Sequence, residues 1–171
     1  MRRTLAVVVV SLSCLVACGS DPLDSCLKET DGTLDCSFAE FNNVDLSGRD
    51  LRNVDLFGTL HGTDLSQANL SGVDLSFMYL RDTDFSGANL EGVDFSESIL
   101  EGVDFSGANL SGANFYATHG VGQNFIGAEL SGTNLYGTDF DTWDFTGAKA
   151  DDETVWPEGF DPEAAGVIFE D

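Results

Sequence analysis

Few side chains in this sequence could take part in catalysis, and the best placed of them are a histidine and an aspartate. His119 and Asp139 lie twenty residues apart, a separation that recurs through the chain and would make them neighbours on consecutive turns of a repeating structure. A histidine beside a carboxylate can act as a general base. However, no serine or cysteine is placed to act as the nucleophile, and two histidines cannot supply a metal cluster. We therefore expect a surface histidine at a bulge, with no catalytic residue, no cofactor and no metal site.

Acidic residues recur at the same spacing of twenty. Carboxylates about 4.8 Å apart in water repel each other by roughly 1 kcal/mol per pair, so such a column is a candidate for weak cation binding or for mimicry of DNA phosphates. The alternative, which we favour, is a solvated face that keeps the protein soluble and blocks edge aggregation. The column consists of Asp64, Asp84, Asp104, Asn124 and Asp144.

The N-terminal segment has the layout of an export signal. Residues 1–17, MRRTLAVVVVSLSCLVA, place two arginines before an apolar run that is too short to span a bilayer comfortably. The sequence Leu15-Val16-Ala17-Cys18 that completes it resembles the bacterial lipobox, which implies that Cys18 is lipidated and becomes the new N-terminus. Cys14 fits that pattern less well. The alternatives are a plain exported protein cut near Ala17 and an uncleaved anchor.

A lipid on Cys18 would hold the mature protein at a membrane of the cell envelope, outside the cytoplasm. Gly19 after the lipidated cysteine favours the outer membrane, and residues 18–25 would form a short spacer. Cys26 and Cys36 then remain as a pair in an oxidising compartment. We predict that they form a disulfide, which closes a loop of 11 residues and contributes about 3 kcal/mol; a free or redox-active pair is the alternative.

The composition limits the partners of the folded part. The chain has 171 residues, enough for one domain, and 30 acidic against 7 basic residues. Nucleic acid and anionic lipid are therefore poor electrostatic partners. The hydrophobic content of 42% is ordinary for a globular protein, so the charge alone does not predict disorder.

A five-residue period determines the rest of the interpretation. Counted in fives from Phe41, with one four-residue step to Leu60, 21 of 22 central positions up to Phe145 are Leu or Phe, and the exception is Gly120. Two residues before each centre lies a small or β-branched residue, Asp or Asn lies between them, and Gly commonly follows two residues after. In extended chain, residues two apart face the same side, so the small residue and the centre face in and the Asp or Asn faces out.

Glycine at the last position suits a type II turn, which requires a positive φ. Five residues thus make one straight side and one corner. The number of sides follows from the spacing at which identical residues recur, which is twenty and not fifteen, so four sides should close one coil. About five coils are expected, and the recurring residues include Ala68, Ala88, Ala108, Ala128 and Ala148, and Phe85, Phe105, Phe125 and Phe145.

These residues resemble the pentapeptide repeat family, whose A-[DN]-L-x-x consensus appears as Ala68-Asn69-Leu70-Ser71-Gly72 and again from Ala88 and Ala108. The resemblance implies an all-β fold, the right-handed quadrilateral β-helix, over residues 41–147. Members of this family that confer quinolone resistance bind DNA gyrase. An acidic inhibitor of such a nucleic-acid enzyme is therefore our alternative to a binding or structural module of the envelope, for which no nucleic-acid partner is expected.

Both ends of a solenoid need a cap. We expect residues 26–40 to close the first end and residues 148–171 the second, where TVWPEGFDP resembles a tail found after the repeats in bacterial members of the family. Val155, Trp156 and Phe160 should lie over the last coil. The alternative is an end-to-end dimer contact, so we expect either a monomer or an end-to-end homodimer.

Aromatic residues gather on one outward edge of the predicted coils. Exposed aromatics without a use are costly, so the strip is a candidate binding surface for an envelope protein or a polysaccharide; the alternative is that it only decorates the corner. Gly120 beside it should leave a hole in the core unless Val121 swings in through a bulge. The strip comprises Phe57, Tyr116 and Tyr136 at one corner, Phe77 beside them, and Tyr79, Ile99 and His119 on the adjoining side.

Overall fold

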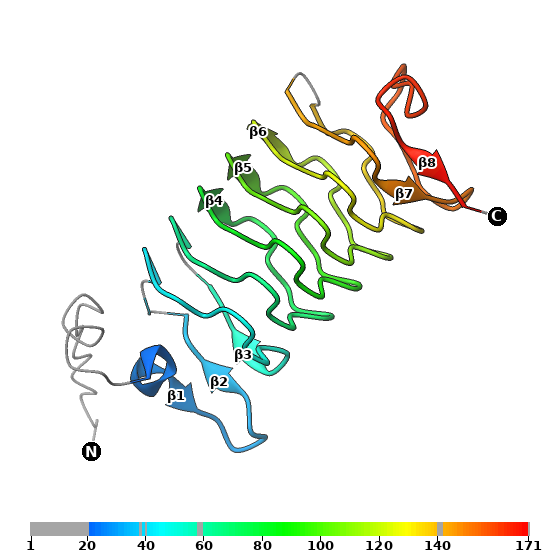
Figure 1. Ribbon diagram of the computed structural model, residues 1–171. Helices are drawn as coiled ribbons and strands as arrows, with labels where there is room; N and C mark the ends of the chain where they lie inside the picture. The colour runs from blue at the N-terminus through cyan, green and yellow to red at the C-terminus, as the bar shows by residue number, and fades with distance from the viewer. Residues whose placement is uncertain (1–20, 38, 40, 58–59, 140–141, 171) are drawn as a thin grey trace, which may run out of the picture.

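The protein is a rod of stacked coils, in which the first and the last described residues lie at opposite ends (Figure 1). The structure, a computed structural model, describes residues 21–170 apart from 38, 40, 58–59 and 140–141. Its regular elements are short because each side of a coil has room for only two or three extended residues. They are the 3₁₀ helix η3 (Pro22–Ser25) and the strands β1 (Leu27–Lys28), β2 (Leu34–Asp35), β3 (Val54–Asp55), β4 (Tyr79–Arg81), β5 (Ile99–Glu101), β6 (His119–Val121), β7 (Lys149–Ala150) and β8 (Ile168–Phe169).

Parallel pairing between residues twenty apart confirms the four-sided coil. β4, β5 and β6 form one parallel sheet in which Leu80, Leu100 and Gly120 are in register. The other sides are joined by single bridges, such as those that link Asp64, Asp84 and Asp104. In the first coil the offset is 19, as between Asp45 and Asp64, which agrees with the predicted four-residue step. The predicted all-β solenoid is therefore confirmed.

The core is built from stacked columns of identical side chains. Phe85, Phe105 and Phe125 lie one coil apart, with ring centroids separated by 5.4 and 4.9 Å. A second column of Phe95 and Phe115 has centroids 4.9 Å apart and meets the first edge to face. All five rings are fully buried. Because successive coils repeat similar inward residues, each of these rings stacks on a ring of a neighbouring coil, and leucines continue the columns where the phenylalanines end.

Threonines at the inward position before the centre satisfy carbonyl groups inside the rod. The buried hydroxyl of Thr118 donates to the Phe95 carbonyl at 2.9 Å, and that of Thr133 donates to the Leu110 carbonyl at 2.8 Å. Each acceptor lies in the preceding coil. These bonds keep a polar side chain in the core without leaving its hydroxyl unpaired.

The corners follow the turn geometry that the glycine positions predict. At the corner of residues 85–88, the Ala88 N–H donates to the Phe85 carbonyl at 2.9 Å, and Gly87 has a φ of 63°. A type II turn requires a positive φ at this position, where glycine carries no steric penalty. The Gly87 N–H also donates to Ser106 of the next coil at 2.8 Å, so the stack is hydrogen-bonded at its corners as well as along its sides.

A hairpin and a disulfide close the N-terminal end. β1 pairs antiparallel with β2, and β2 pairs parallel with β3, so the ladder of coils extends down to Leu34. Cys26 and Cys36 are joined by a disulfide with their Cα atoms 4.6 Å apart, and Cys36 is buried. Asp21 caps η3 and forms an ion pair with Arg49 at 2.7 Å.

Aromatic side chains close the C-terminal end. The rings of Trp156 and Phe160 lie over Phe145, with centroids 5.6 and 5.5 Å from it, and they stack on each other at 5.2 Å. The expectation for Val155 was wrong, because this side chain is 46% exposed. Thr154 takes the inward position instead, where its hydroxyl donates to the Leu130 carbonyl at 2.9 Å, and the next residue must therefore point outward.

Candidate functional site

The four sides of the rod differ in the residues that they turn outward. We name them A to D in chain order and define each by its outward column. Side A carries Asp45, Asp64, Asp84, Asp104, Asn124 and Asp144; side B carries Asp50, Asn69, Asn89, Asn109, Glu129 and Lys149; side C carries Asp55, Asp74, Asp94, Asn114, Asn134 and Val155; side D carries Tyr79, Ile99 and His119.

The carboxylates of side A form a column, as the spacing predicted, but each of them accepts a hydrogen bond from the corner that follows it in the chain. An Oδ1 atom of Asp84 accepts the N–H of Ser86 at 2.8 Å, and Asp104 accepts that of Ser106 at 2.8 Å. Hydrogen bonds from the Thr146 hydroxyl and N–H lower the pKa of Asp144. Each side chain is thereby turned along the chain toward the corner, and none converges with its neighbours. Among the described residues, no group of three His, Cys, Asp or Glu side chains could hold a metal ion.

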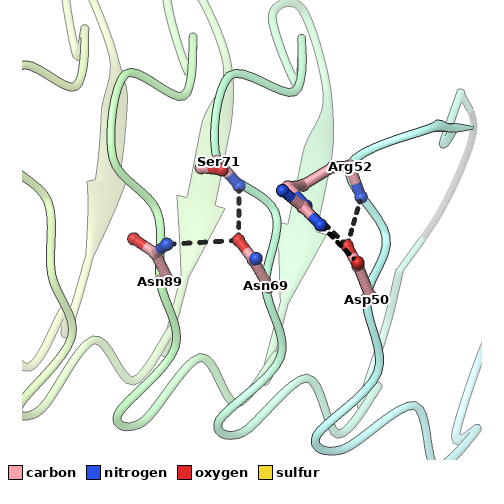
Figure 2. Close-up of polar contacts among 5 residues, drawn as sticks. All are labelled: Asp50, Arg52, Asn69, Ser71 and Asn89. Atoms are coloured by element: carbon pink, nitrogen blue, oxygen red, sulfur yellow. Dashed lines mark hydrogen bonds and ion pairs between the residues drawn. The ribbon is translucent and has the colours of Figure 1, made fainter.

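Side B is a ladder of amides with ion pairs at both ends. The Asn89 Nδ2 donates to the Asn69 Oδ1 at 3.2 Å (Figure 2). Asn109 repeats this contact with Asn89 at 3.2 Å. At the N-terminal end, Arg52 forms two hydrogen bonds with Asp50, at 2.8 and 2.6 Å (Figure 2), which lower the pKa of Asp50 to about 2.

At the other end of side B, Lys149 bridges Glu129 and Glu170 at 3.0 and 3.1 Å. The amide groups in the middle of the side already hydrogen-bond to one another. Many of the hydrogen-bonding and charged groups of side B are therefore already paired within the rod.

Four of the predicted strip residues lie exposed at the corner between sides C and D. We call them the aromatic corner: Phe57, Phe77, Tyr116 and Tyr136, with exposed fractions of 61, 68, 46 and 53%. The rings of Tyr116 and Tyr136 stack one coil apart, with centroids 6.2 Å apart and planes inclined by 13°. The structure thus brings together the residues that the spacing assigned to this corner.

Side D adjoins the aromatic corner and is the flat face of the β4–β5–β6 sheet. Tyr79, Ile99 and His119 lie in register across it, as expected, and Arg81, Glu101 and Val121 form a second outward row. Ile99 is 47% exposed and Val121 is 59% exposed. The column of Tyr79, Ile99 and His119 is aromatic or apolar for the most part, whereas the outward columns of sides A, B and C consist mainly of Asp and Asn.

Three side chains at the lower end of side D form a closed polar group. The Tyr79 hydroxyl donates to Glu101 at 2.7 Å, and the Arg81 guanidinium reaches both Glu101 at 2.9 Å and the Tyr79 hydroxyl at 2.8 Å. The hydrogen bond to Glu101 raises the pKa of Tyr79. The Arg81 Cζ also lies 5.6 Å from the centroid of the Tyr79 ring, a cation–π distance. This face therefore already holds one cation against an aromatic ring and a carboxylate.

The fault in the repeat differs from what the sequence predicted. Val121 does not swing into the core, and β6 keeps its register with β5 without a bulge. Gln123, which is 1% exposed, takes the inward position that threonine occupies in other coils, and its Nε2 donates to the Leu100 carbonyl at 2.6 Å. A side chain at Gly120 would collide with that Nε2 at 2.8 Å. Gly120 therefore makes room for Gln123.

Sequence reasoning missed the role of Gln123 and the outward position of Val121 next to Ile99, which it had already placed on this side. A signal for Gln123 was present, because a long amide occupies an inward position three residues after the single glycine centre. His119 and Asp139 are both exposed, so neither lies in an enclosed site of the kind that general-base catalysis uses.

Cys18 lies outside the described residues. Within the part of the chain that the structure describes, no helix has the length and hydrophobicity that a membrane crossing needs.

Comparisons with known proteins agree with this geometry. A family profile described as pentapeptide repeats matches residues 59–96, 88–119 and 124–151, in eight copies, which together make up more than half of the chain. A pentapeptide repeat protein from the thylakoid lumen of Arabidopsis thaliana is 33% identical over 62% of this chain and 68% of its own, with a TM-score of 0.52.

Two further solved structures show the range of similarity. Rfr23, a pentapeptide repeat protein from the cyanobacterium Cyanothece 51142, is 33% identical over 59% of this chain and 65% of its own, with a TM-score of 0.38. QnrB1, a plasmid-mediated fluoroquinolone resistance protein, is 18% identical over 80% of this chain and 84% of its own, with a TM-score of 0.30. No curated protein matches this chain.

Proposed function

Because this chain belongs to the pentapeptide repeat family, with its eight matched repeats, we propose that it is a non-enzymatic binding module of the bacterial cell envelope. In this proposal the rod is held at the membrane by a lipid on Cys18, with the outer membrane favoured, and it presents one side to a partner. The lipobox-like sequence before Cys18 supports the anchor.

The observation that carries the binding role is the contrast between side D with its corner and the other three sides. Sides A and B use their outward carboxylates and amides for turns and ladders within the rod. Six of the eleven large hydrophobic side chains exposed among the described residues lie on the aromatic corner and side D: Phe57, Phe77, Ile99, Tyr116, Val121 and Tyr136. A soluble protein rarely gathers such residues on one surface unless the surface binds something.

The disulfide fits a tethered rod. Cys26 lies eight residues after Cys18 and is bonded to Cys36. The disulfide would therefore stabilise the end of the rod that lies nearest to the membrane anchor. The aromatic corner would then project away from the membrane along a rod of about five coils, roughly 25 Å in length.

Metabolic labelling with radioactive palmitate tests the anchor. Wild-type protein and the Cys14→Ser variant, the matched control, should both incorporate label and sediment with membranes. The Cys18→Ser variant should lose the label and appear in the soluble extracytoplasmic fraction. Equal labelling of the Cys18→Ser variant would show that the anchor has been assigned to the wrong residue. Absence of label from the wild type and from both variants would overturn lipidation.

The carboxylate column of side A favours a second candidate function, which is inhibition of a nucleic-acid enzyme such as DNA gyrase by charge mimicry. The column is interrupted by Asn124, and its described members turn toward their own corners. Purified residues 18–171 in a gyrase supercoiling assay separate the two functions. Inhibition at low micromolar protein would favour mimicry over the envelope module.

A further inference from the structure

The aromatic corner contains a gap that is one coil high. Phe77 lies on one coil and Tyr116 lies two coils further along, and Ser96 and Glu97 occupy the coil between them. Two hydrogen bonds define this order: the Phe77 N–H donates to the Ser96 carbonyl at 3.0 Å, and the Glu97 N–H donates to the Tyr116 carbonyl at 2.9 Å. Since neighbouring coils are about 4.8 Å apart, the two aromatic residues are separated by about 10 Å along the rod.

The chemistry of this gap suits a cationic side chain. A cation is attracted to an aromatic face within about 6 Å of the ring centroid. Two residues whose coils are about 10 Å apart along the rod leave one intervening coil, over which a guanidinium or ammonium group can approach both. Glu97 provides an exposed carboxylate in the same gap. Between residues 57 and 137 the sequence has ten acidic residues and a single basic one, Arg81, so the potential around the gap attracts positive charge.

We propose that the aromatic corner and side D form a docking surface for a cationic polypeptide segment. A Lys or Arg of that partner enters between Phe77 and Tyr116 and pairs with Glu97, while its apolar residues cover Ile99 and Val121. The proposal deepens the proposed function and rests on it, because it names the surface and the partner chemistry of the same binding module.

The backbone at Phe77 supports the assignment. Its φ of 58° lies in the left-handed region, which at most other corners is occupied by glycine. A bulky residue there costs about 1 kcal/mol relative to glycine. Phe77 is also 68% exposed, so its ring gains little from burial in the free protein. The backbone strain at Phe77 is therefore not offset by burial of its ring in the free protein. A bound partner that covers the ring would offset it.

Charge and ring geometry disfavour the other occupants. A second copy of the chain, or an anionic lipid surface, would bring negative charge against a rod that has five basic and 30 acidic residues after its signal segment. A polysaccharide binds best to ring faces turned outward, whereas Tyr116 and Tyr136 turn their faces to each other. A cationic polypeptide meets neither obstacle.

Fluorescence anisotropy with purified mature protein tests the proposal. The probe is a fluorescein-labelled peptide of alternating arginine and leucine, RLRLRL, at 150 mM NaCl. The comparison probes are the ELELEL peptide, cellohexaose in competition, and vesicles of phosphatidylglycerol. We expect saturable binding of RLRLRL alone, and tight binding of any comparison probe without RLRLRL binding would overturn the assigned occupant.

Variants locate the site. Glu97→Gln and Tyr116→Ser should each weaken RLRLRL binding at least tenfold. Glu91→Gln removes the same charge from an exposed position at another corner, and Ile126→Ser removes an exposed apolar side chain at the corner diagonally opposite; both should change affinity less than twofold. Equal effects of Glu97→Gln and Glu91→Gln would show diffuse attraction and overturn the site.

The Phe77→Gly variant separates binding from folding. It should raise the melting temperature, because glycine relieves the positive φ, and should lower peptide affinity at least tenfold. Unchanged affinity in this variant would overturn the role of Phe77. Lipid labelling at Cys18 is independent of these substitutions, so failure of the docking surface and failure of the envelope anchor are distinguishable.

Discussion

The exchange at Gly120 and Gln123 can be tested by a double-mutant cycle. A Cβ atom at Gly120 would lie 1.6 Å from the Leu100 carbonyl oxygen and 2.8 Å from the Gln123 Nε2, and its φ is 151°. No side chain fits these distances unless the backbone moves. In the regular coil two turns below, Leu80 and Thr83 occupy the equivalent positions and both are buried. The substitutions Gly120→Leu and Gln123→Thr together therefore restore a coil that the rod already contains.

The magnitudes follow from the geometry. Gly120→Leu alone must move backbone against Leu100 and overpack the space that holds Gln123, which costs about 3 kcal/mol. Gln123→Thr alone replaces the amide with a hydroxyl that can donate to the Leu100 carbonyl, as Thr133 donates to that of Leu110, but it leaves a void beside Gly120, which costs about 2 kcal/mol. The double variant should be at least as stable as the wild type, which gives a coupling energy of about 5 kcal/mol, above the usual range for neighbouring residues.

Urea unfolding followed by far-ultraviolet circular dichroism measures these differences. Gly107→Ala is the control, because Gly107 also has a positive φ, of 62°, but open space around its Cβ position; it should cost only about 1 kcal/mol. The reasoning is refuted if Gly120→Leu destabilises no more than Gly107→Ala, or if adding Gln123→Thr does not recover the loss.

Three further predictions concern the two ends of the rod. Reduction of the Cys26–Cys36 disulfide should lower the free energy of unfolding by about 3 kcal/mol, measured as a drop in the urea midpoint; an unchanged midpoint would contradict this. Trp156→Ala uncovers Phe145 and should cost about 3 kcal/mol, with Val155→Ala as a near-neutral control by thermal unfolding. Asp50 should titrate with a pKa of about 2 because Arg52 pairs with its charged form. Its contribution to stability is therefore fully present above the usual Asp pKa and is lost as the pH falls through about 2; a carboxyl NMR titration midpoint near 4 would argue against the ion pair.

The five-residue repeat predicted which residues are neighbours on successive coils, but it did not predict the side-chain packing where the repeat is broken. It correctly placed Tyr136 one coil above Tyr116 and Asp84 one coil above Asp64, because parallel stacking brings residues twenty apart into contact whatever the residues are. It could not decide which side chain fills the space beside Gly120, since Val121 and Gln123 were both within reach. Only the register shows that Val121 must point outward while Gln123 can extend inward to the Leu100 carbonyl.

The same limit applies to Val155. The offset between coils changes from 20 to 21 at its bridge with Asn134, and this single inserted residue reverses which neighbour faces the core. An apolar side chain is consequently outside and the Thr154 hydroxyl inside. A periodic pattern does not reveal such a shift at the last coil, where no further repeat follows to fix the count.

Inward and outward side chains alternate along each side of the rod, so outward residues can be substituted without unfolding the protein. Inward residues carry the stability, because the buried Leu and Phe columns contact the coils above and below. Outward residues such as Tyr116 contact mainly their column neighbours, here a ring at 6.2 Å, a pair worth about 1 kcal/mol. Substitution of the aromatic corner should therefore leave the rod folded. A loss of binding there would report on recognition and not on stability, which is why side D and its corner are the part of this regular molecule where a function can be assigned by mutation.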